Sequence, residues 1–395
     1  MQRLASAVTR TGHAEIAGGG LGGLTAAAAL GQGGWSVRVH ERAGSVRATG
    51  SGIFIAENGL RVLDALGACD EALEGGHRFY RRETRDHRNR VIATDTWPPE
   101  AGQRIYVIAR ERLVQALRAA AERAGAEICT SSEVTGLDAD GRLSLASGDA
   151  PAGDLVIGAD GVNSRVRAAL PIPVRRRSLH GGAIRAIVPW SPADHPLPES
   201  TFAEYWTGPR RVFYAPISPN EAYIALMTVT ADAAGTREPP DLDSWTRSFP
   251  FLDYLFRRID NPLRWTAFEE IRMPRWHQGR VALIGDAAHA MAPNLGQGGG
   301  TAMMDGISLA ANVVGAEDIE GALVRWEARE RVIVDRIQFL SWTYGELSRW
   351  PAALRNLALW ALGVSGWMKR VRKMGASFVP DGVGPGRSAS PESSR

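Results

Sequence analysis

"AEIAGGGLGGLTAAAALGQGGWSVRVHE", residues 14–41, is the stretch that decides the fold. It begins with a short apolar run, passes through a glycine turn into an alanine-rich segment, and ends in an alternating run that closes on Glu41. Short apolar and alternating runs are typical of strands, whereas an alanine-rich segment favours a helix. The stretch therefore predicts a strand, a tight turn, a helix and a second strand.

The turn has the spacing Gly18-x-Gly20-x-x-Gly23. Glycines at this spacing permit a sharp bend, the close approach of a pyrophosphate, and tight packing of the helix on the strand. The helix start offers free N–H groups, and Glu41, 23 residues after Gly18, can accept hydrogen bonds from ribose hydroxyls. We expect a bound dinucleotide; the alternative is the glycine turn of an ordinary strand–helix unit.

Composition and charge exclude several other classes of protein. The chain has 395 residues, 44% of them hydrophobic, and a net charge of only +3. Its arginine-rich runs are interrupted by acids, which favours a solvated face over a nucleic-acid interface. No apolar run is long enough to span a membrane and no signal-peptide core is present, so we expect a cytoplasmic protein without a membrane partner. Two cysteines and eight scattered histidines predict neither a disulfide framework nor a metal site.

Two further motifs follow apolar runs that read as strands. "DLVIGADG" ends in Asp160-Gly161, and "VALIGDAAHAMAPNLGQGGG" contains Asp286 directly after its run. Ligands of open α/β sheets bind beyond the carboxyl ends of the strands, where Asp286 could accept from polyol hydroxyls. A loop poor in side chains lets a flat ring lie against the backbone. This combination points to a flavin, and the loop residues expected to contact it are Pro293, Gly296, Gly298 and Gly299.

The strand and helix pattern predicts a mixed α/β protein. A Rossmann-type FAD-binding domain is expected over residues 1–77, 98–178 and 272–380, with C-terminal helices. Alternating segments joined by Pro/Gly/Asn turns predict an inserted antiparallel β-sheet over residues 179–271, which should carry the substrate. Residues 381–395 are expected to be disordered. The apolar segment 354–375, with its basic end, is expected to close the core, although it could also dock on a membrane or a partner.

These three motifs, in this order, resemble the FAD-dependent aromatic hydroxylases of the para-hydroxybenzoate hydroxylase class. The resemblance implies FAD as cofactor, NADH or NADPH as reductant, and oxygenation of a small aromatic substrate by O2 through a C4a-hydroperoxyflavin. It implies that Glu41 binds the adenosine ribose, that Asp286 holds the ribityl chain, and that Arg110 contacts the flavin tail. It also implies that Asp160 serves both FAD and NAD(P)H. Arg42 and Arg47 are further candidates for contact with the cofactor.

A closer resemblance is to the hydroxypyridine-carboxylate oxygenases of this class, which also open the ring. "GLRVLDALGACDEAL", "RVFYAPISPNEAYIALM" and "FPFLDYL" carry it. Arg211 and Tyr223 match the substrate pocket and are the expected catalytic pair, since an arginine fork can hold a carboxylate or phenolate. Arg82, Arg185 and Pro293 are further candidate substrate contacts. The segment Phe54–Glu57 and Arg82 depart from that pattern, which predicts an altered pocket.

Two other functions fit the same fold. The first is a flavin-dependent halogenase or a prenyl-chain reductase, although the WxWxIP segment of related halogenases is missing from the sequence. The second is a protein that binds FAD without turnover. We expect a monomer or a homodimer.

Overall fold

The computed structural model describes residues 11–46, 51–194, 197–259 and 263–384. The nucleotide-binding half is built on a six-stranded sheet with the order β18-β19-β12-β1-β2-β8. All neighbours in it are parallel except β18 and β19. The strands are β1 (His13–Ala17), β2 (Ser36–His40), β8 (Glu127–Cys129), β12 (Leu155–Gly158), β18 (His277–Gln278) and β19 (Val281–Leu283).

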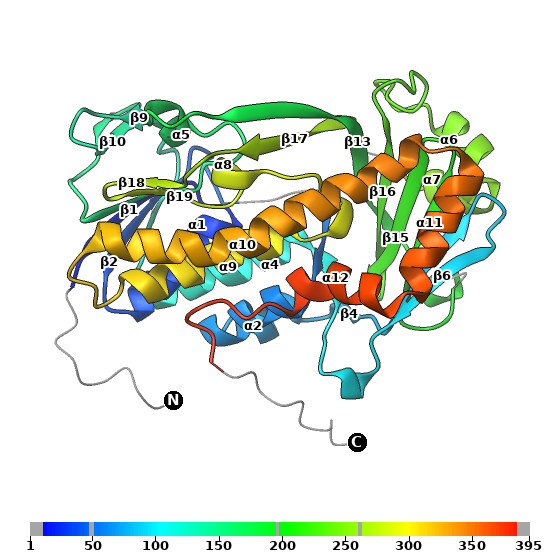
Figure 1. Cartoon of the computed structure of the whole chain (residues 1–395), viewed down its shortest axis with the longest axis horizontal. Helices are drawn as coiled ribbons and strands as arrows, with labels where there is room; N and C mark the ends of the chain where they lie inside the picture. The colour runs from blue at the N-terminus through cyan, green and yellow to red at the C-terminus, as the bar shows by residue number, and fades with distance from the viewer. Residues whose placement is uncertain (1–10, 47–50, 195–196, 260–262, 385–395) are drawn as a thin grey trace.

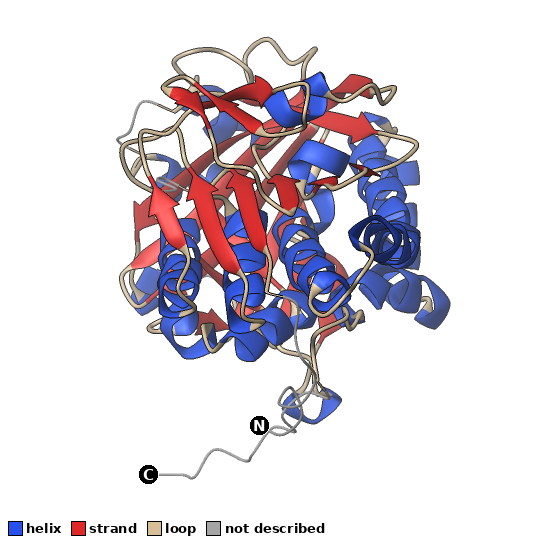
Figure 2. Cartoon of the chain, turned by 90° about the vertical axis from the view of Figure 1, so that its left-hand side faces the viewer, coloured by secondary structure: helices blue, strands red, loops and turns tan. Residues whose placement is uncertain are grey.

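Helices pack along this sheet, as Figure 2 shows. The expected strand, turn, helix and strand are present, with α1 (Leu21–Gln32) between β1 and β2. Nine of its twelve residues are buried, because α1 lies among α4 and α9 as well as against the sheet. This explains its small, apolar composition. The other helices of this half are α2 (Glu57–Leu66), α3 (Cys69–Leu73), α4 (Arg110–Arg123), α5 (Arg165–Ala169), α8 (Asp286–His289) and α9 (Gly298–Val313).

The second half is a seven-stranded sheet with the order β17-β13-β16-β15-β14-β5-β6. Its pairs are antiparallel apart from β14 and β5. The sheet also contains β5 and β6, within residues 81–96, and its strand β13 begins at Arg175, so the sheet includes more of the chain than the expected insertion. The domain boundaries themselves stay a prediction. The strands are β5 (Arg81–Asp86), β6 (Val91–Thr96), β13 (Arg175–Pro189), β14 (Thr201–Thr207), β15 (Arg210–Ser218), β16 (Glu221–Val229) and β17 (Thr266–Arg272).

Successive residues of a strand point to opposite faces of its sheet, and here the two faces have different neighbours. The outer face carries Tyr205, Tyr214 and Ile224, which pack with Trp245 and Phe249 in a core of their own. Tyr214 is thus a core residue. The outer face is covered by α6 (Leu242–Ser248), η3 (Pro250–Leu252) and α7 (Asp253–Phe256). The inner face is turned toward the nucleotide-binding half.

Two small sheets and short turns complete this framework. One small sheet has the order β11-β10-β9 and the other β3-β7-β4. The second joins the two halves, since β7 contacts β15 and β3 contacts both α9 and β13. The elements are β3 (Gly52–Ile55), β4 (His77–Arg78), β7 (Tyr106–Ala109), β9 (Val134–Leu137), β10 (Leu143–Leu145), β11 (Gly148–Asp149), η1 (Pro99–Ala101), η2 (Pro192–Asp194) and η4 (Pro293–Leu295).

Of three helices at the carboxyl end, α10 runs across both halves, α11 packs on β6 and α12 on α2 (Figure 1). They are α10 (Ile319–Glu346), α11 (Ala352–Val364) and α12 (Gly366–Ser377), with η5 (Leu347–Arg349) between the first two. The apolar segment expected as one helix is two, because the chain turns at Ser365, whose backbone is extended. Of the tail expected to be disordered, residues 385–395 lie outside the described residues.

Candidate active site

The glycine turn before α1 is shaped by close contacts of its backbone. A Cβ atom on Gly18, which has a φ of +102°, would lie 2.4 Å from the carbonyl oxygen of Ala159, and one on Gly23 would lie 2.0 Å from that of Gly18. A Cβ on Gly20 would meet nothing within 4 Å. Two glycines therefore hold helix and strands together, whereas Gly20 faces open space at the start of α1. No side chain caps that helix end, so its N–H groups are available to bind an anion.

Glu41 lies beside this turn, at the end of β2. Its carboxylate accepts a hydrogen bond from the backbone N–H of Gly19 at 3.0 Å and another from Ala43 at 2.9 Å. The two bonds fix the carboxylate and leave it further lone pairs for hydroxyl groups. Arg42 follows it and is exposed. Arg47, the other candidate here, lies outside the described residues.

The second motif is tied to the third by an arginine that sequence reasoning missed. Asp160 accepts from the backbone N–H of Arg165 at 2.6 Å, while its other carboxylate oxygen is buried and has no partner among the described residues. Arg167 is buried and donates to the carbonyl oxygens of Val162 at 2.6 Å and Ala287 at 2.9 Å. The ends of β12 and β19 are therefore held at one edge of the sheet.

Asp286 starts α8 at this edge and reaches solvent. Surrounding protein atoms raise the pKa of its carboxyl by limiting its hydration, an effect that His289 and Arg110 oppose. Arg110 is the first residue of α4, and its backbone N–H donates to the carbonyl oxygen of Ser51 at 2.9 Å. The carboxylate therefore lies at a polar, accessible position with a cation in its vicinity, as a polyol contact requires.

The loop after α8 exposes backbone at one of its three expected flavin-contacting glycines. Pro293 starts η4 and is exposed, and Gly298, the first residue of α9, has free space at its Cβ position. The other two are packed: Gly296 has a φ of +66° and lies against Phe54, and Gly299 lies against Ile53. The loop thus packs on β3 and presents a side-chain-poor surface toward the inner face of the large sheet.

Arg211 lies on that inner face and is the most enclosed cation of the site, with 4% of its surface exposed. Its guanidinium lies 4.9 Å from the ring centre of Trp206 and 5.6 Å from that of Tyr344. Nη2 donates to Asn294 Oδ1 at 2.5 Å, whereas Nη1 has no hydrogen-bond partner among the described residues. An oxygen of a ligand would satisfy Nη1, since a buried unpaired donor is costly.

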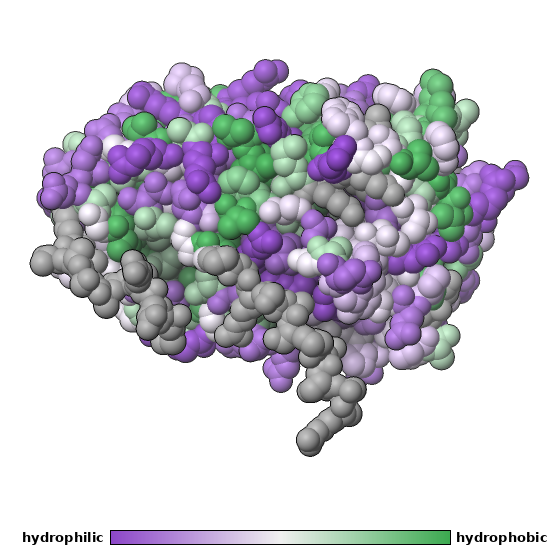
Figure 3. Space-filling model, turned by 60° about the horizontal axis from the view of Figure 1, so that its bottom comes forward, coloured by the Kyte–Doolittle hydropathy of each residue, from purple (hydrophilic) through white to green (hydrophobic). Residues whose placement is uncertain are grey.

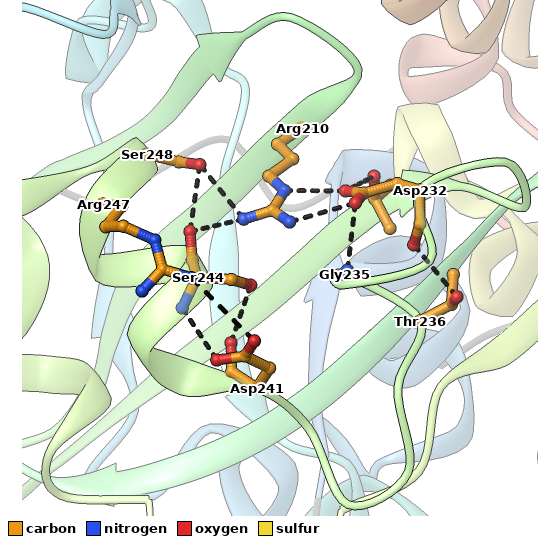
Figure 4. Close-up of polar contacts among 9 residues, drawn as sticks. Arg210, Asp232, Gly235, Thr236, Asp241, Ser244, Arg247 and Ser248 are labelled. Carbon is orange, nitrogen blue, oxygen red and sulfur yellow. Dashed lines mark hydrogen bonds and ion pairs between the residues drawn. The ribbon is translucent and has the colours of Figure 1, made fainter.

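The neighbouring arginine shows the contrast between the two faces. Arg210 points to the outer face, where its guanidinium pairs with Asp232 at 2.6 Å and donates to the carbonyl oxygen of Ser244 (Figure 4). All of these partners belong to the same half of the protein. Arg210 therefore stabilises the sheet, and Arg211 faces the site.

A pocket with an enclosed volume of about 40 Å³ lies beside Arg211 and opens to solvent. Met227, Phe268 and Trp342 give it apolar walls, and Asn294 lies at its side next to Arg211. The remaining walls come from β13, β16 and η5. The pocket therefore combines an aromatic, apolar lining with one enclosed cation.

Tyr223 lies on the same face of the sheet, closer to β3, where its ring touches Gly52. Burial raises the pKa of its phenol, and Arg185 and Arg110 oppose this shift. It is therefore a hydrogen-bond donor at neutral pH. Because Arg110 acts on both Tyr223 and Asp286, the inner face of the sheet and the third motif meet at this cation.

Arg82, another expected substrate contact, is not among the described residues that line this pocket. It is enclosed, donates to the Tyr344 hydroxyl at 3.1 Å and lies 3.8 Å from Asp95. The same hydroxyl donates to Glu204 at 2.7 Å. Arg82 thus orients Tyr344, which packs against Arg211. Arg185 is half-buried over the Phe268 ring, a wall of the pocket.

Comparison with known proteins identifies the cofactor that these features fit. Residues 12–319 match the family described as FAD binding domain. The chain belongs to the FAD-dependent monooxygenases. The expected mixed α/β fold, the FAD cofactor and the use of NAD(P)H are thereby confirmed. The roles of individual site residues stay predictions.

Several relatives of this monooxygenase match over nearly the whole chain. AqdB1 of Rhodococcus erythropolis is 41% identical over 94% of this chain and 98% of its own. The 2-heptyl-3-hydroxy-4(1H)-quinolone synthase of Mycobacteroides abscessus is 39% identical, covering 90% of this chain and 96% of its own. The tetrameric form of 2-methyl-3-hydroxypyridine-5-carboxylic acid oxygenase superposes with a TM-score of 0.83, at 37% identity over 93% and 97% of the two chains. The structural match agrees with the resemblance seen in the sequence.

The FAD-binding edge rests on a buried acid cluster. Asp305 accepts from the backbone N–H of Gly285 at 2.8 Å and pairs with His289 at 2.7 Å. Although burial alone would lower the pKa of His289, the Asp305 carboxylate raises it. His289 thus shapes the loop through its pair with Asp305. Glu330 of α10 is buried near Asp305, and burial raises its pKa to about 8.

Glu330 is expected to make this monooxygenase less stable as the pH rises from 4.5 toward 8. In that window the unfolded chain releases the proton while the folded chain keeps it, so the free energy of unfolding falls, by on the order of 4 kcal/mol. Glu330→Gln should flatten the dependence of Tm on pH, because the amide does not titrate. Glu320→Gln, at an exposed position of the same helix, is the control and should keep the wild-type dependence of Tm on pH. An unchanged slope in Glu330→Gln would show that Glu330 titrates normally.

Proposed function

We propose that this monooxygenase hydroxylates an N-heteroaromatic ring that carries an oxygen substituent and an apolar side chain, of the 2-alkyl-4-quinolone type. The new hydroxyl would be placed on the ring carbon next to the oxygen-bearing one. The observation that carries the proposal is the enclosed guanidinium of Arg211, whose Nη1 has no partner within the described part of the chain and lies at the edge of an apolar, aromatic-lined pocket. The named quinolone synthase at 39% identity supports it.

The chain's own residues would prepare the ring for oxygenation. Bound FAD takes electrons from NAD(P)H and activates O2, which supplies the oxygen atom. Arg211 would stabilise negative charge on the substrate oxygen, and this charge makes the ring carbons ortho and para to it more electron-rich. Tyr223 would donate a hydrogen bond that fixes the plane of the ring. The apolar inner face of the sheet would exclude water from the reacting atoms.

A second candidate substrate is a hydroxypyridine carboxylate, with ring opening. The fork of Arg211 would suit its carboxylate, and the structural match at a TM-score of 0.83 is to an oxygenase of such a compound. The two substrates make different demands on the pocket. A carboxylate needs the cation alone, whereas an alkyl chain needs the walls formed by Met227, Phe268 and Trp342.

Ligand binding discriminates between the two candidates. The flavin absorbance of the FAD-loaded protein is titrated with 2-heptyl-4-quinolone, with 4-quinolone and with 2-methyl-3-hydroxypyridine-5-carboxylate. Burial of a heptyl chain should lower Kd by at least about 100-fold relative to 4-quinolone, since each buried methylene contributes about 0.8 kcal/mol. Equal Kd values for the two quinolones, with tighter binding of the carboxylate, would reverse the assignment.

Tyr223→Phe is expected to keep FAD and to lower kcat by about 5-fold, because one neutral hydrogen bond contributes about 1 kcal/mol. KM should change little, since the pocket walls stay intact. The measurement is substrate-stimulated NAD(P)H oxidation together with peroxide release. Tyr214→Phe, on the outer face, is the matched control and should keep the wild-type kcat. If both variants behaved alike, Tyr223 would have no part in positioning the ring.

A further inference from the structure

Helix α11 presents an apolar ridge to solvent. Leu357 is 59% exposed, Trp360 51% and Trp367, at the start of α12, 65%. Leu354 and Val364, three residues before Leu357 and four after Trp360, are exposed on the same stripe of α11, and the exposed Trp350 precedes the helix. The opposite stripe, with Leu359 and Gly363, is buried against β6 and Trp206. Only one face of α11 closes the core, and the other exposes four large apolar side chains, as interaction sites do.

The charge of this region indicates which kind of partner would bind the ridge formed by these exposed apolar side chains. Residues 347–380 contain six basic residues and no acid, whereas the whole chain has a net charge of only +3. Arg355 is buried and Arg349 pairs with Glu346, and the other four basic residues of this region form the run "KRVRK" at 369–373. Figure 3 shows hydrophobic side chains on the right-hand part of the surface, where Figure 1 places α11, beside hydrophilic ones. Trp and Leu on one helix face next to a basic run fit an anionic bilayer surface.

A second copy of this chain fits the ridge less well. Dimers with two-fold symmetry bring the same patch of both subunits together. Such a contact would set two acid-free basic runs against each other, which costs Coulomb energy. Among the described residues, no helix is both long and apolar enough to cross a bilayer. The ridge therefore suits a protein that lies on a membrane.

We propose that α11 and the start of α12 dock this monooxygenase on a membrane that carries anionic lipid headgroups. The ridge adjoins the substrate pocket, because Ser348 and Arg349 line the pocket immediately before Trp350. The Arg355 guanidinium of α11 also lies 6.0 Å from the ring of Trp206, another wall of the pocket. An alkylated substrate dissolved in the bilayer would then reach the pocket directly; this last step rests on the proposed function.

Vesicle co-sedimentation of the FAD-loaded full chain tests the docking. The wild type should sediment with phosphatidylcholine vesicles that contain phosphatidylglycerol, less with phosphatidylcholine alone, and less at high salt. Leu357→Gln/Trp360→Gln should lower the partition coefficient by at least about 10-fold, since two apolar side chains no longer insert. Val332→Ser, an equally exposed apolar position on α10, is the control and should sediment as the wild type.

Two results would overturn the proposal. One is the absence of sedimentation with either vesicle, or equal sedimentation of the wild type and Leu357→Gln/Trp360→Gln. The other is a concentration-dependent dimer in sedimentation velocity without lipid that the double substitution abolishes, which would assign the ridge to a second copy. Sedimentation requires no turnover, so the two proposals are tested independently. A protein that does not sediment with vesicles could still hydroxylate its substrate in solution, and a protein that does not hydroxylate the substrate could still sediment.

Discussion

Arg211→Met is expected to lower kcat/KM for the aromatic substrate by about 100-fold, roughly 2.7 kcal/mol of transition-state stabilisation. The methionine fills much of the same volume between Trp206 and Tyr344 but offers no donor to a ring oxygen. NAD(P)H consumption should become weakly stimulated by substrate, and a larger share of it should end as peroxide. FAD content should stay that of the wild type, because Arg211 lies on the sheet and not at the glycine turn.

Two further variants separate substrate binding from a general loss of structure. Arg211→Lys keeps the charge without the planar fork and should retain an intermediate kcat/KM. Arg176→Met removes an exposed arginine of β13, which pairs with Glu269, and should leave kcat/KM unchanged. A fully active, tightly coupled Arg211→Met protein would contradict the role given to this residue.

Gly20→Ala and Gly23→Ala are expected to abolish FAD binding for different reasons. At Gly20 the methyl group meets no protein atom, so the FAD-free protein should keep its Tm, while a bound pyrophosphate would collide with it. Its FAD affinity should fall by at least about 100-fold, ~3 kcal/mol. At Gly23 the methyl group would lie 2.0 Å from the carbonyl oxygen of Gly18, so the fold itself should be destabilised.

The measurements are the Tm of the FAD-free proteins and FAD titration by quenching of flavin fluorescence. Gly298→Ala, where space is also free at the other side of the site, should behave like Gly20→Ala in Tm. Wild-type FAD affinity in Gly20→Ala would mean that no phosphate approaches this turn. A wild-type Tm in FAD-free Gly23→Ala would mean that α1 does not depend on the close contact.

The nucleotide-binding half was predictable because its signals are local. The turn from Gly18 to Gly23 and the aspartates at 160 and 286 each follow a strand within a few residues, and parallel strands bring such ends together. The alternation in residues 180–229 likewise predicted an antiparallel sheet. The pairing of β14 with β5 was not predictable, because it joins residues more than a hundred positions apart and one of them is arginine-rich.

The substrate side was only partly predictable, since its contacts are long-range. Arg211 was singled out by resemblance, but its neighbours Trp206, Asn294 and Tyr344 come from three separate elements and share no spacing. The bridging role of Arg167 has no sequence signal either, because the sequence does not distinguish a buried arginine that binds carbonyl oxygens from an arginine on the surface. The segment 354–375 was expected to close the core, with docking on a membrane or a partner as the alternative, because an apolar stripe does not say what covers it.

The central claim is that this monooxygenase couples NAD(P)H oxidation to hydroxylation of a ring held by Arg211. It is tested most directly by incubating the FAD-loaded protein with NADH or NADPH, 18O2 and 2-heptyl-4-quinolone, and by measuring the mass of the product alongside peroxide. We predict a product that carries one 18O atom, in near-stoichiometric yield with the reductant consumed. Reductant consumption that substrate does not stimulate and that ends entirely as peroxide would contradict it.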